Sequence, residues 1–153
     1  MGSLRPKASA AVGALVLAAL ASGTSFAADV HATSDLKGEW SGTLRQFSHD
    51  IDDSFPVKLT VSTISGDEFT GIMEWPTFEG CRTKVQGAFD GKLIKWTETA
   101  YLKGDDVVLH GLYVAQFKAD DEIAGDWMDP KHTISPSGPR YGTAGASFTL
   151  TKQ

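Results

Sequence analysis

Apolar and polar residues alternate along this chain from about residue 39 to its end. In residues 55–63 the pattern is clearest, because polar side chains separate Phe55, Val57, Leu59 and Val61. A period of two is typical of a β-strand with one buried face. The pattern predicts eight strands, over residues 39–47, 55–63, 68–75, 81–89, 93–102, 107–117, 122–128 and 146–151.

Glycine recurs inside these predicted strands, at Gly71, Gly87, Gly111 and Gly125. A glycine in a strand interior marks a bend, a bulge or a close approach of two backbones. The connections are mostly short and polar, which favours antiparallel neighbours. We therefore expect an all-β fold, an eight-stranded antiparallel up-and-down β-barrel. No helix is expected.

Two predicted connections are longer, over residues 48–54 and 129–145. The second is rich in Pro, Ser and Gly. Loops of this length are uncommon in compact domains and are often functional. We expect the loop over residues 129–145 to cover one opening of the barrel.

The N-terminal segment has the features of a secretory signal peptide. Arg5 and Lys7 precede an apolar run over residues 8–20, and Ser25-Phe26-Ala27 supplies the small residues of a cleavage site. The expected organisation is a signal peptide over 1–27, a loose polar arm over 28–37 and a barrel domain over 38–153. The protein is expected to be secreted or periplasmic, with no membrane span after signal removal.

Composition narrows the classes of partner. Beyond residue 27 the chain carries 12 Lys or Arg and 19 Asp or Glu, a net charge of about −7. Binding of nucleic acid needs clustered basic residues, so nucleic acid is excluded as a partner. Cys81 is the single cysteine, which excludes an internal disulfide, and we expect it to be a small, half-buried strand residue.

No sequence motif indicates a cofactor, a metal ion or catalysis. The chain has no P-loop, dinucleotide fingerprint, nucleophile elbow or HExxH. The acidic run His49-Asp50-Ile51-Asp52-Asp53 lacks the turn glycine and terminal glutamate of a calcium loop, so it is interpreted as a solvated loop. His110 lies in a predicted strand with no triad partner at a recognisable spacing.

Short motifs along the predicted strands carry a family resemblance. They are Gly38-Glu39-Trp40, Phe69-Thr70-Gly71, Val85-Gln86-Gly87, Trp96-Thr97, His110-Gly111-Leu112-Tyr113 and Asp126-Trp127. In order and strand context they resemble the calycin-type barrels, the lipocalins and especially the avidins, over most of residues 38–151. The resemblance implies a closed barrel plugged at one end by Trp40, a pocket walled by Trp96 and Trp127, and a possible homo-oligomer.

The ligand-specific positions of the avidins are largely not matched. Ile72-Met73 stands where the avidins have a tyrosine, the polar positions after the Gly-x-Trp are Ser41, Thr43 and Arg45, and Ala144-Gly145-Ala146-Ser147-Phe148 lacks the aspartate of the last strand. The lipocalin arginine that stacks on the first tryptophan is also absent from the last strands. The resemblance therefore does not imply binding of biotin.

A candidate ligand site follows from the aromatic residues. Its predicted apolar wall consists of Trp75, Trp96, Tyr113 and Trp127. Glu98 shares a strand face with Trp96, and a buried carboxylate needs a partner, for which Arg82 is the candidate. The opposite parity, with Thr97 and Thr99 facing inward, stays open because a bulge shifts every side chain to the other face.

The favoured function is non-catalytic binding of a small, partly hydrophobic molecule by an exported barrel. The alternative is a protein-interaction or inhibitor-type envelope accessory module with a filled barrel, whose partner is another envelope protein. That module would act through residues 48–54 or 129–145. A third hypothesis is a small barrel enzyme, such as an isomerase or a hydrolase, using Glu98 or His110.

Overall fold

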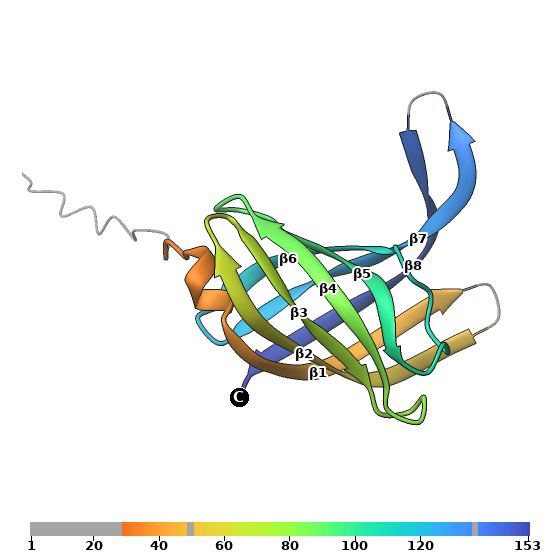
Figure 1. Cartoon of the computed structure of the whole chain (residues 1–153), viewed down its shortest axis with the longest axis horizontal. Coiled ribbons are helices and arrows are strands. Elements are labelled where there is room, and N and C mark those ends of the chain that lie inside the picture. The colour runs from red at the N-terminus through yellow and green to blue at the C-terminus, as the bar shows by residue number, and fades with distance from the viewer. Residues whose placement is uncertain (1–28, 49–50, 136–137) are drawn as a thin grey trace, which may run out of the picture.

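Eight antiparallel strands form a closed barrel in sequence order, and the last strand pairs with the first (Figure 1). The computed structural model describes residues 29–48, 51–135 and 138–153. The strands are β1 (Gly38–Ser48), β2 (Ile51–Ser65), β3 (Glu68–Trp75), β4 (Cys81–Phe89), β5 (Ile94–Lys103), β6 (Leu112–Ala119), β7 (Glu122–Ser135) and β8 (Gly138–Lys152). The predicted all-β, up-and-down barrel is confirmed.

The period of two in the sequence separates the inside of the barrel from its outside. In β3, Phe69, Met73 and Trp75 are buried, and exposed or half-buried residues lie between them. β4 follows the same rule, and Cys81 is buried with a free thiol at its start. The core is therefore the interior of one barrel. No helix in the described part of the chain is both long and apolar enough to cross a membrane.

Glycines allow neighbouring strands to approach closely at the bends of the sheet. A Cβ atom on Gly71 would lie 2.1 Å from the carbonyl oxygen of Thr60, and one on Gly125 would lie 1.9 Å from that of Val114. Side-chain carbons are not found this close to another backbone. Both glycines thus allow two strands to approach closely, as their positions within strands predicted.

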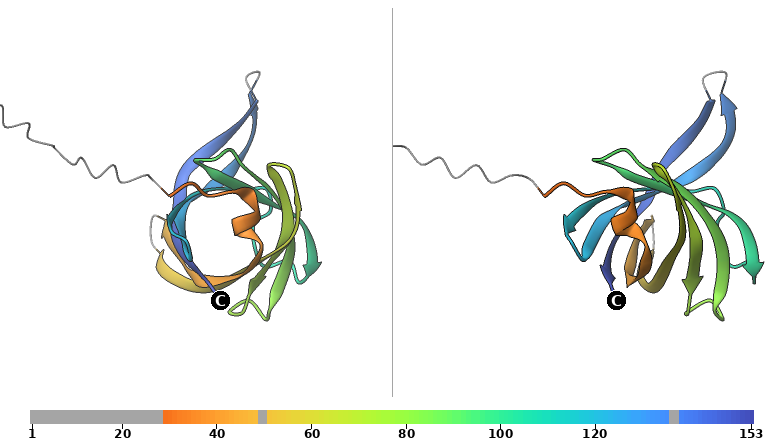
Figure 2. Two further views of the ribbon diagram at one scale, coloured as in Figure 1. Left: turned by 90° about the vertical axis from the view of Figure 1, so that its left-hand side faces the viewer. Right: turned by 60° about the vertical axis from the view of Figure 1, so that its left-hand side comes forward.

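A short 3₁₀ helix, η1 (Thr33–Leu36), covers one end of the barrel, as the end-on view in Figure 2 shows. Leu36 is buried, and its carbonyl oxygen accepts a hydrogen bond from Trp40 Nε1 at 2.7 Å. The Lys152 ammonium donates to the carbonyl oxygen of Asp35 at 2.7 Å. The expectation of a loose arm without a helix is therefore wrong for these residues, because apolar burial and hydrogen bonds hold the segment against the barrel.

The two connections that were expected to be long loops are mostly strand. β1 runs to Ser48 and β2 begins at Ile51, while β7 runs to Ser135 and β8 begins at Gly138. The far part of β7 and β8 is a two-stranded ribbon that projects away from the barrel (Figure 1). The prediction that residues 129–145 cover the opening as a loop is thus wrong. His49, Asp50 and the predicted signal peptide over 1–27 lie outside the described residues.

The barrel wall is least continuous between β5 and β6. These strands pair at Ile94, Lys95 and Trp96, and beyond this point the backbone N–H of His110 donates to the carbonyl oxygen of Glu98. The predicted strand over residues 107–117 in fact begins at Leu112. Residues 104–111 instead form a connection in which His110 has a φ of +67°, so His110 is not the strand residue that was expected.

Candidate functional site

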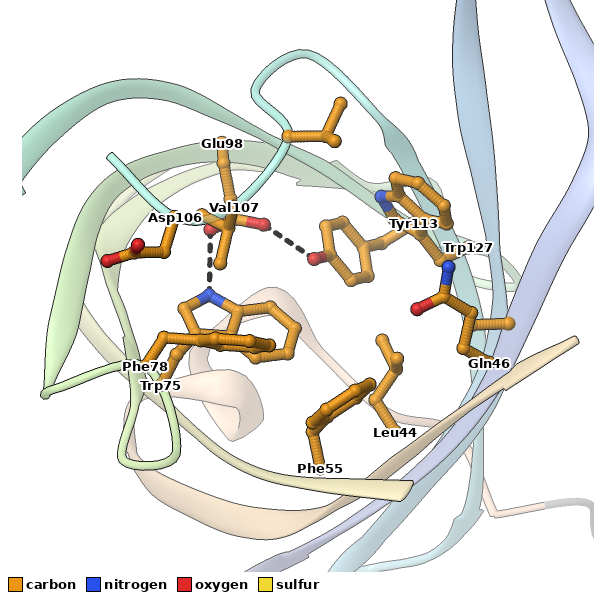
Figure 3. A pocket seen from close by; sticks show the side chains of 12 residues that line it. Leu44, Gln46, Phe55, Trp75, Phe78, Glu98, Asp106, Val107, Tyr113 and Trp127 are labelled. Carbon is orange, nitrogen blue, oxygen red and sulfur yellow. Dashed lines mark hydrogen bonds between the residues drawn. The ribbon is translucent and has the colours of Figure 1, made fainter. Parts of the chain in front are cut away.

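A cavity of about 130 Å³ opens at the end of the barrel opposite η1. Aromatic and aliphatic side chains dominate its wall, as Figure 3 shows: Leu44, Phe55, Trp75, Phe78, Val107, Tyr113 and Trp127. Glu98 and Asp106 also line it. Its volume is similar to that of an engineered cavity of about 150 Å³ in another protein, which holds one benzene molecule. The interior of the barrel is therefore not completely filled.

Glu98 is the buried charged residue of this cavity, with 1% of its surface exposed. Trp75 Nε1 donates a hydrogen bond to Glu98 Oε2 at 3.1 Å, and the Tyr113 hydroxyl donates to Oε1 at 2.5 Å. The hydroxyl of Thr83, which is also buried, donates to Oε2. β5 therefore faces the interior with Trp96 and Glu98, and the parity with Thr97 and Thr99 inward is excluded.

Aromatic side chains approach the cavity from two sides. On one side the ring centroids of Phe55 and Phe78 lie 5.0 Å apart, and those of Trp75 and Phe78 lie 6.3 Å apart. On the other side the ring centroids of Tyr113 and Trp127 lie 6.5 Å apart. Figure 3 shows the carboxyl group of Glu98 hydrogen-bonded to Trp75 of the first group and to Tyr113 of the second. A compact apolar group in the cavity would thus contact aromatic rings on both sides.

Trp127 brings a hydrogen-bond donor that finds no acceptor within the described part of the chain. Its Nε1 atom is buried, and it packs so tightly on Gly111 that a Cβ there would lie 2.0 Å away. The absence of a side chain at Gly111 therefore makes room for the indole of Trp127, and Gly111 does not mark a bend in a strand. A buried donor without an acceptor costs about 1–3 kcal/mol.

Two predicted site residues lie elsewhere. Trp96 is buried behind Tyr113, with the two rings stacked at 4.9 Å, and it supports the wall without lining the cavity. Arg82 is exposed on the outer face of β4, where its Nε lies 3.7 Å from the Glu74 carboxylate. The predicted Glu98–Arg82 pair is therefore wrong, because Arg82 and the inward-facing Thr83 are neighbours on opposite faces of one strand.

Phe55, Phe78, Val107 and Asp106 line the cavity and were not among the predicted site residues. Phe55 was recognised as an apolar strand residue, so its sequence signal indicated burial but not ligand contact. Phe78 and Val107 lie in connections, where no periodic pattern indicates the direction of a side chain. Only the closure of the barrel brings these residues to the same opening.

Burial raises the pKa of Glu98 above its ordinary value of 4.5, and the hydrogen bonds from Thr83, Tyr113 and Trp75 oppose this shift in part. Burial and the nearby Glu98 raise the pKa of Tyr113 well above 10.0. A carboxyl group whose pKa is raised in the folded protein binds its proton more tightly there than in the unfolded chain. The contribution of Glu98 to stability is therefore fully present below pH 4.5 and is lost as the pH rises through the raised pKa.

We expect Glu98→Gln to flatten the dependence of stability on pH. In the wild type the free energy of unfolding decreases as the pH rises from the ordinary pKa of Glu98 to its raised pKa. The amide of the variant does not titrate, so this decrease should be absent. Urea denaturation from pH 4 to pH 8 measures the difference between the two proteins. The control is Glu74→Gln, which removes a carboxylate from the outer face. Parallel curves for the wild type and Glu98→Gln would contradict the prediction.

Comparisons with known proteins support the fold. No protein-family model and no curated protein matches the chain. Among solved structures, the redesigned β-barrel b11L5F_LGL is similar with a TM-score of 0.54 and 10% sequence identity, over 81% of this chain and 96% of that chain. EF1p2_mFAP2b bound to DFHBI is similar with a TM-score of 0.54 and 13% identity, over 80% and 97%. At such low identity these similarities show the barrel fold alone.

Among the residues with described positions, no group of three or more His, Cys, Asp and Glu side chains is arranged to hold a metal ion. The acidic run that begins at His49 lies partly outside those residues. His110 is exposed on the connection before β6. The chemistry of the described site is therefore that of an aromatic cavity around one hydrogen-bonded carboxyl group.

Proposed function

We propose that this protein binds a small, partly apolar molecule in the cavity at the open end of the barrel, without catalysis. The observation that carries the proposal is the cavity itself, which combines aromatic side chains on two sides with a buried, hydrogen-bonded Glu98. Ligand sites are typically concave and mostly apolar, with a few placed polar groups. One solved barrel of similar fold was determined bound to DFHBI, which supports the use of such an interior for a small molecule.

The alternative of a filled barrel that acts only through its loops is less well supported. A filled interior would leave Trp75, Tyr113 and Trp127 packed against other side chains, whereas all three border the cavity. The described cavity therefore leaves room for a further molecule.

We also propose that residues 1–27 direct export and are removed, which places the mature protein outside the cytoplasm. The basic start, the apolar run and the small residues before the cleavage site support this. Mass spectrometry of the protein from the extracytoplasmic fraction tests it. A mature chain that begins at Ala28 is expected, and an intact Met1 would contradict it.

We expect ligand binding to change the fluorescence of the tryptophans at the cavity and not that of Trp40. Trp75 and Trp127 line the cavity, whereas Trp40 is fully buried beside η1 at the other end. Titration with a panel of small aromatic molecules measures the change. The change should persist in Trp40→Phe and decrease strongly in the double variant Trp75→Phe/Trp127→Phe. If no compound gives a response, or if the response disappears in Trp40→Phe, the proposed site is wrong.

A further inference from the structure

The two charged side chains in the described lining of the cavity are both acidic. Glu98 is buried in the wall and Asp106 is exposed at the mouth, Gln46 is neutral, and no Lys, Arg or His is among the lining residues whose side chains the structure describes. Among these residues, a ligand carboxylate or phosphate would meet two acidic groups and no cation. The lining therefore disfavours an anion and favours a ligand that carries positive charge.

The hydrogen bonds of Glu98 leave room for one more donor. A carboxylate accepts about four hydrogen bonds. Trp75, Thr83 and Tyr113 provide three donors, all of them neutral. These bonds hold the carboxylate in place but offset only part of the free-energy cost of burying its negative charge. A cation within hydrogen-bond distance would supply the opposite charge.

The aromatic walls are suited to the same class of ligand. The face of an aromatic ring attracts a cation, with a contribution of about 0.5–2 kcal/mol that increases when water is excluded. Trp75 and Phe78 present rings on one side of Glu98, and Tyr113 and Trp127 present rings on the other (Figure 3). Aromatic rings on two sides of a buried carboxylate, with Trp75 and Tyr113 hydrogen-bonded to it through Nε1 and the hydroxyl, leave the remaining ring surface available to a compact organic cation.

We propose that the ligand is an aromatic or compact aliphatic amine in its protonated form, whose ammonium group donates to Glu98. The proposal rests on the proposed function and specifies the ligand class of that same cavity. The volume of about 130 Å³ limits the buried part to the size of about one ring. Larger substituents would extend past Asp106 into the open mouth.

Binding of such an amine should strengthen as Glu98 loses its proton. Tyr113 on β6 and Tyr101 on β5 are the titratable groups that interact with Glu98, and Asp106 on the connection before β6 shares the cavity lining with it. Tyr113 stays protonated in this range because its pKa is raised well above 10.0. Glu98 is buried and has a raised pKa, so we assign the expected rise in affinity between pH 5 and pH 8 to the loss of its proton.

The test uses four probes that differ in charge and hydrogen bonding but share one ring: benzylamine, benzyltrimethylammonium, benzyl alcohol and benzoate. Isothermal titration calorimetry at pH 8 should give a dissociation constant for benzylamine at least tenfold lower than that for benzyl alcohol. Benzyltrimethylammonium, which has no N–H, should lie between them, and benzoate should bind most weakly. From pH 5 to pH 8 the affinity for benzylamine should rise.

Glu98→Gln should remove most of the tenfold preference for benzylamine over benzyl alcohol and the pH dependence of that preference. Glu74→Gln, which removes a carboxylate on the outside of the barrel, should leave both affinities unchanged. Binding of benzyl alcohol as tightly as benzylamine would overturn the amine proposal and retain the proposed function. Absence of binding by all four probes and by the wider panel would overturn both. Circular dichroism establishes that each variant is folded.

Discussion

Gly125→Ala should destabilise the barrel by about 3 kcal/mol, the upper end of the usual cost of overpacking. The added Cβ would lie 1.9 Å from the carbonyl oxygen of Val114 and 2.6 Å from the Cα of Ala115, both on β6. Backbone atoms cannot rotate away as the end of a side chain can, so β6 and β7 would have to separate. Urea denaturation measures the loss as a lower midpoint.

The matched control is Gly66→Ala. Gly66 has a φ of +60° and no atom within 4 Å of an added Cβ, so this change costs only the conformational strain of about 1 kcal/mol. The difference between the two alanine variants isolates the contact between strands. Equal losses would show that β6 and β7 are not held at this distance in solution.

Trp40→Ala should cost about 3–5 kcal/mol, the usual range for removal of a buried tryptophan. Trp40 has no exposed surface, its ring centroid lies 6.3 Å from that of Phe117 in an edge-to-face arrangement, and the Lys152 ammonium lies 5.4 Å from the Trp40 ring centroid. Its Nε1 also holds η1 through the carbonyl oxygen of Leu36. Small domains are stable by about 5–15 kcal/mol, so this variant would be close to unfolding at 37 °C.

Trp40→Phe distinguishes the contribution of the aromatic ring to stability from that of the hydrogen bond. The smaller ring keeps most of the apolar contact, while the Leu36 carbonyl oxygen loses its partner, so a loss of about 1–2 kcal/mol is expected. Thermal unfolding followed by circular dichroism gives both values. If Trp40→Ala proved as stable as Trp40→Phe, the tryptophan would not be the main stabilising residue of the closed end.

The barrel could be predicted from the sequence because a period of two and interior glycines are consequences of a closed sheet. The bounds of β3 and β4 were predicted correctly. The ends of β7 and β8 were not, because Pro, Ser and Gly obscured the alternation and pairing with the neighbouring strand determines where such a ribbon ends. η1 escaped prediction because four residues are too few to show a helical period.

The candidate site was predictable in part. Glu98, Trp75 and Tyr113 were selected as candidate site residues with the direction of Glu98 left open, and the structure brings all three into one hydrogen-bonded group. The partner of Glu98 was chosen by charge, which favoured Arg82. The alternation that places Val85 inside also places Thr83 inside and Arg82 outside, so strand parity was the better guide.

The short pairing between β5 and β6 gives the barrel a side that opens more easily than the rest of its wall. Past Trp96 the two strands separate, and residues 104–111 fill the gap with Asp106, Val107 and Val108 at the cavity. Segments with few backbone pairs open at lower free energy than the fold as a whole. We expect exchange of the ligand to proceed by local opening of this connection, so that the rate of release and the affinity are determined by different residues.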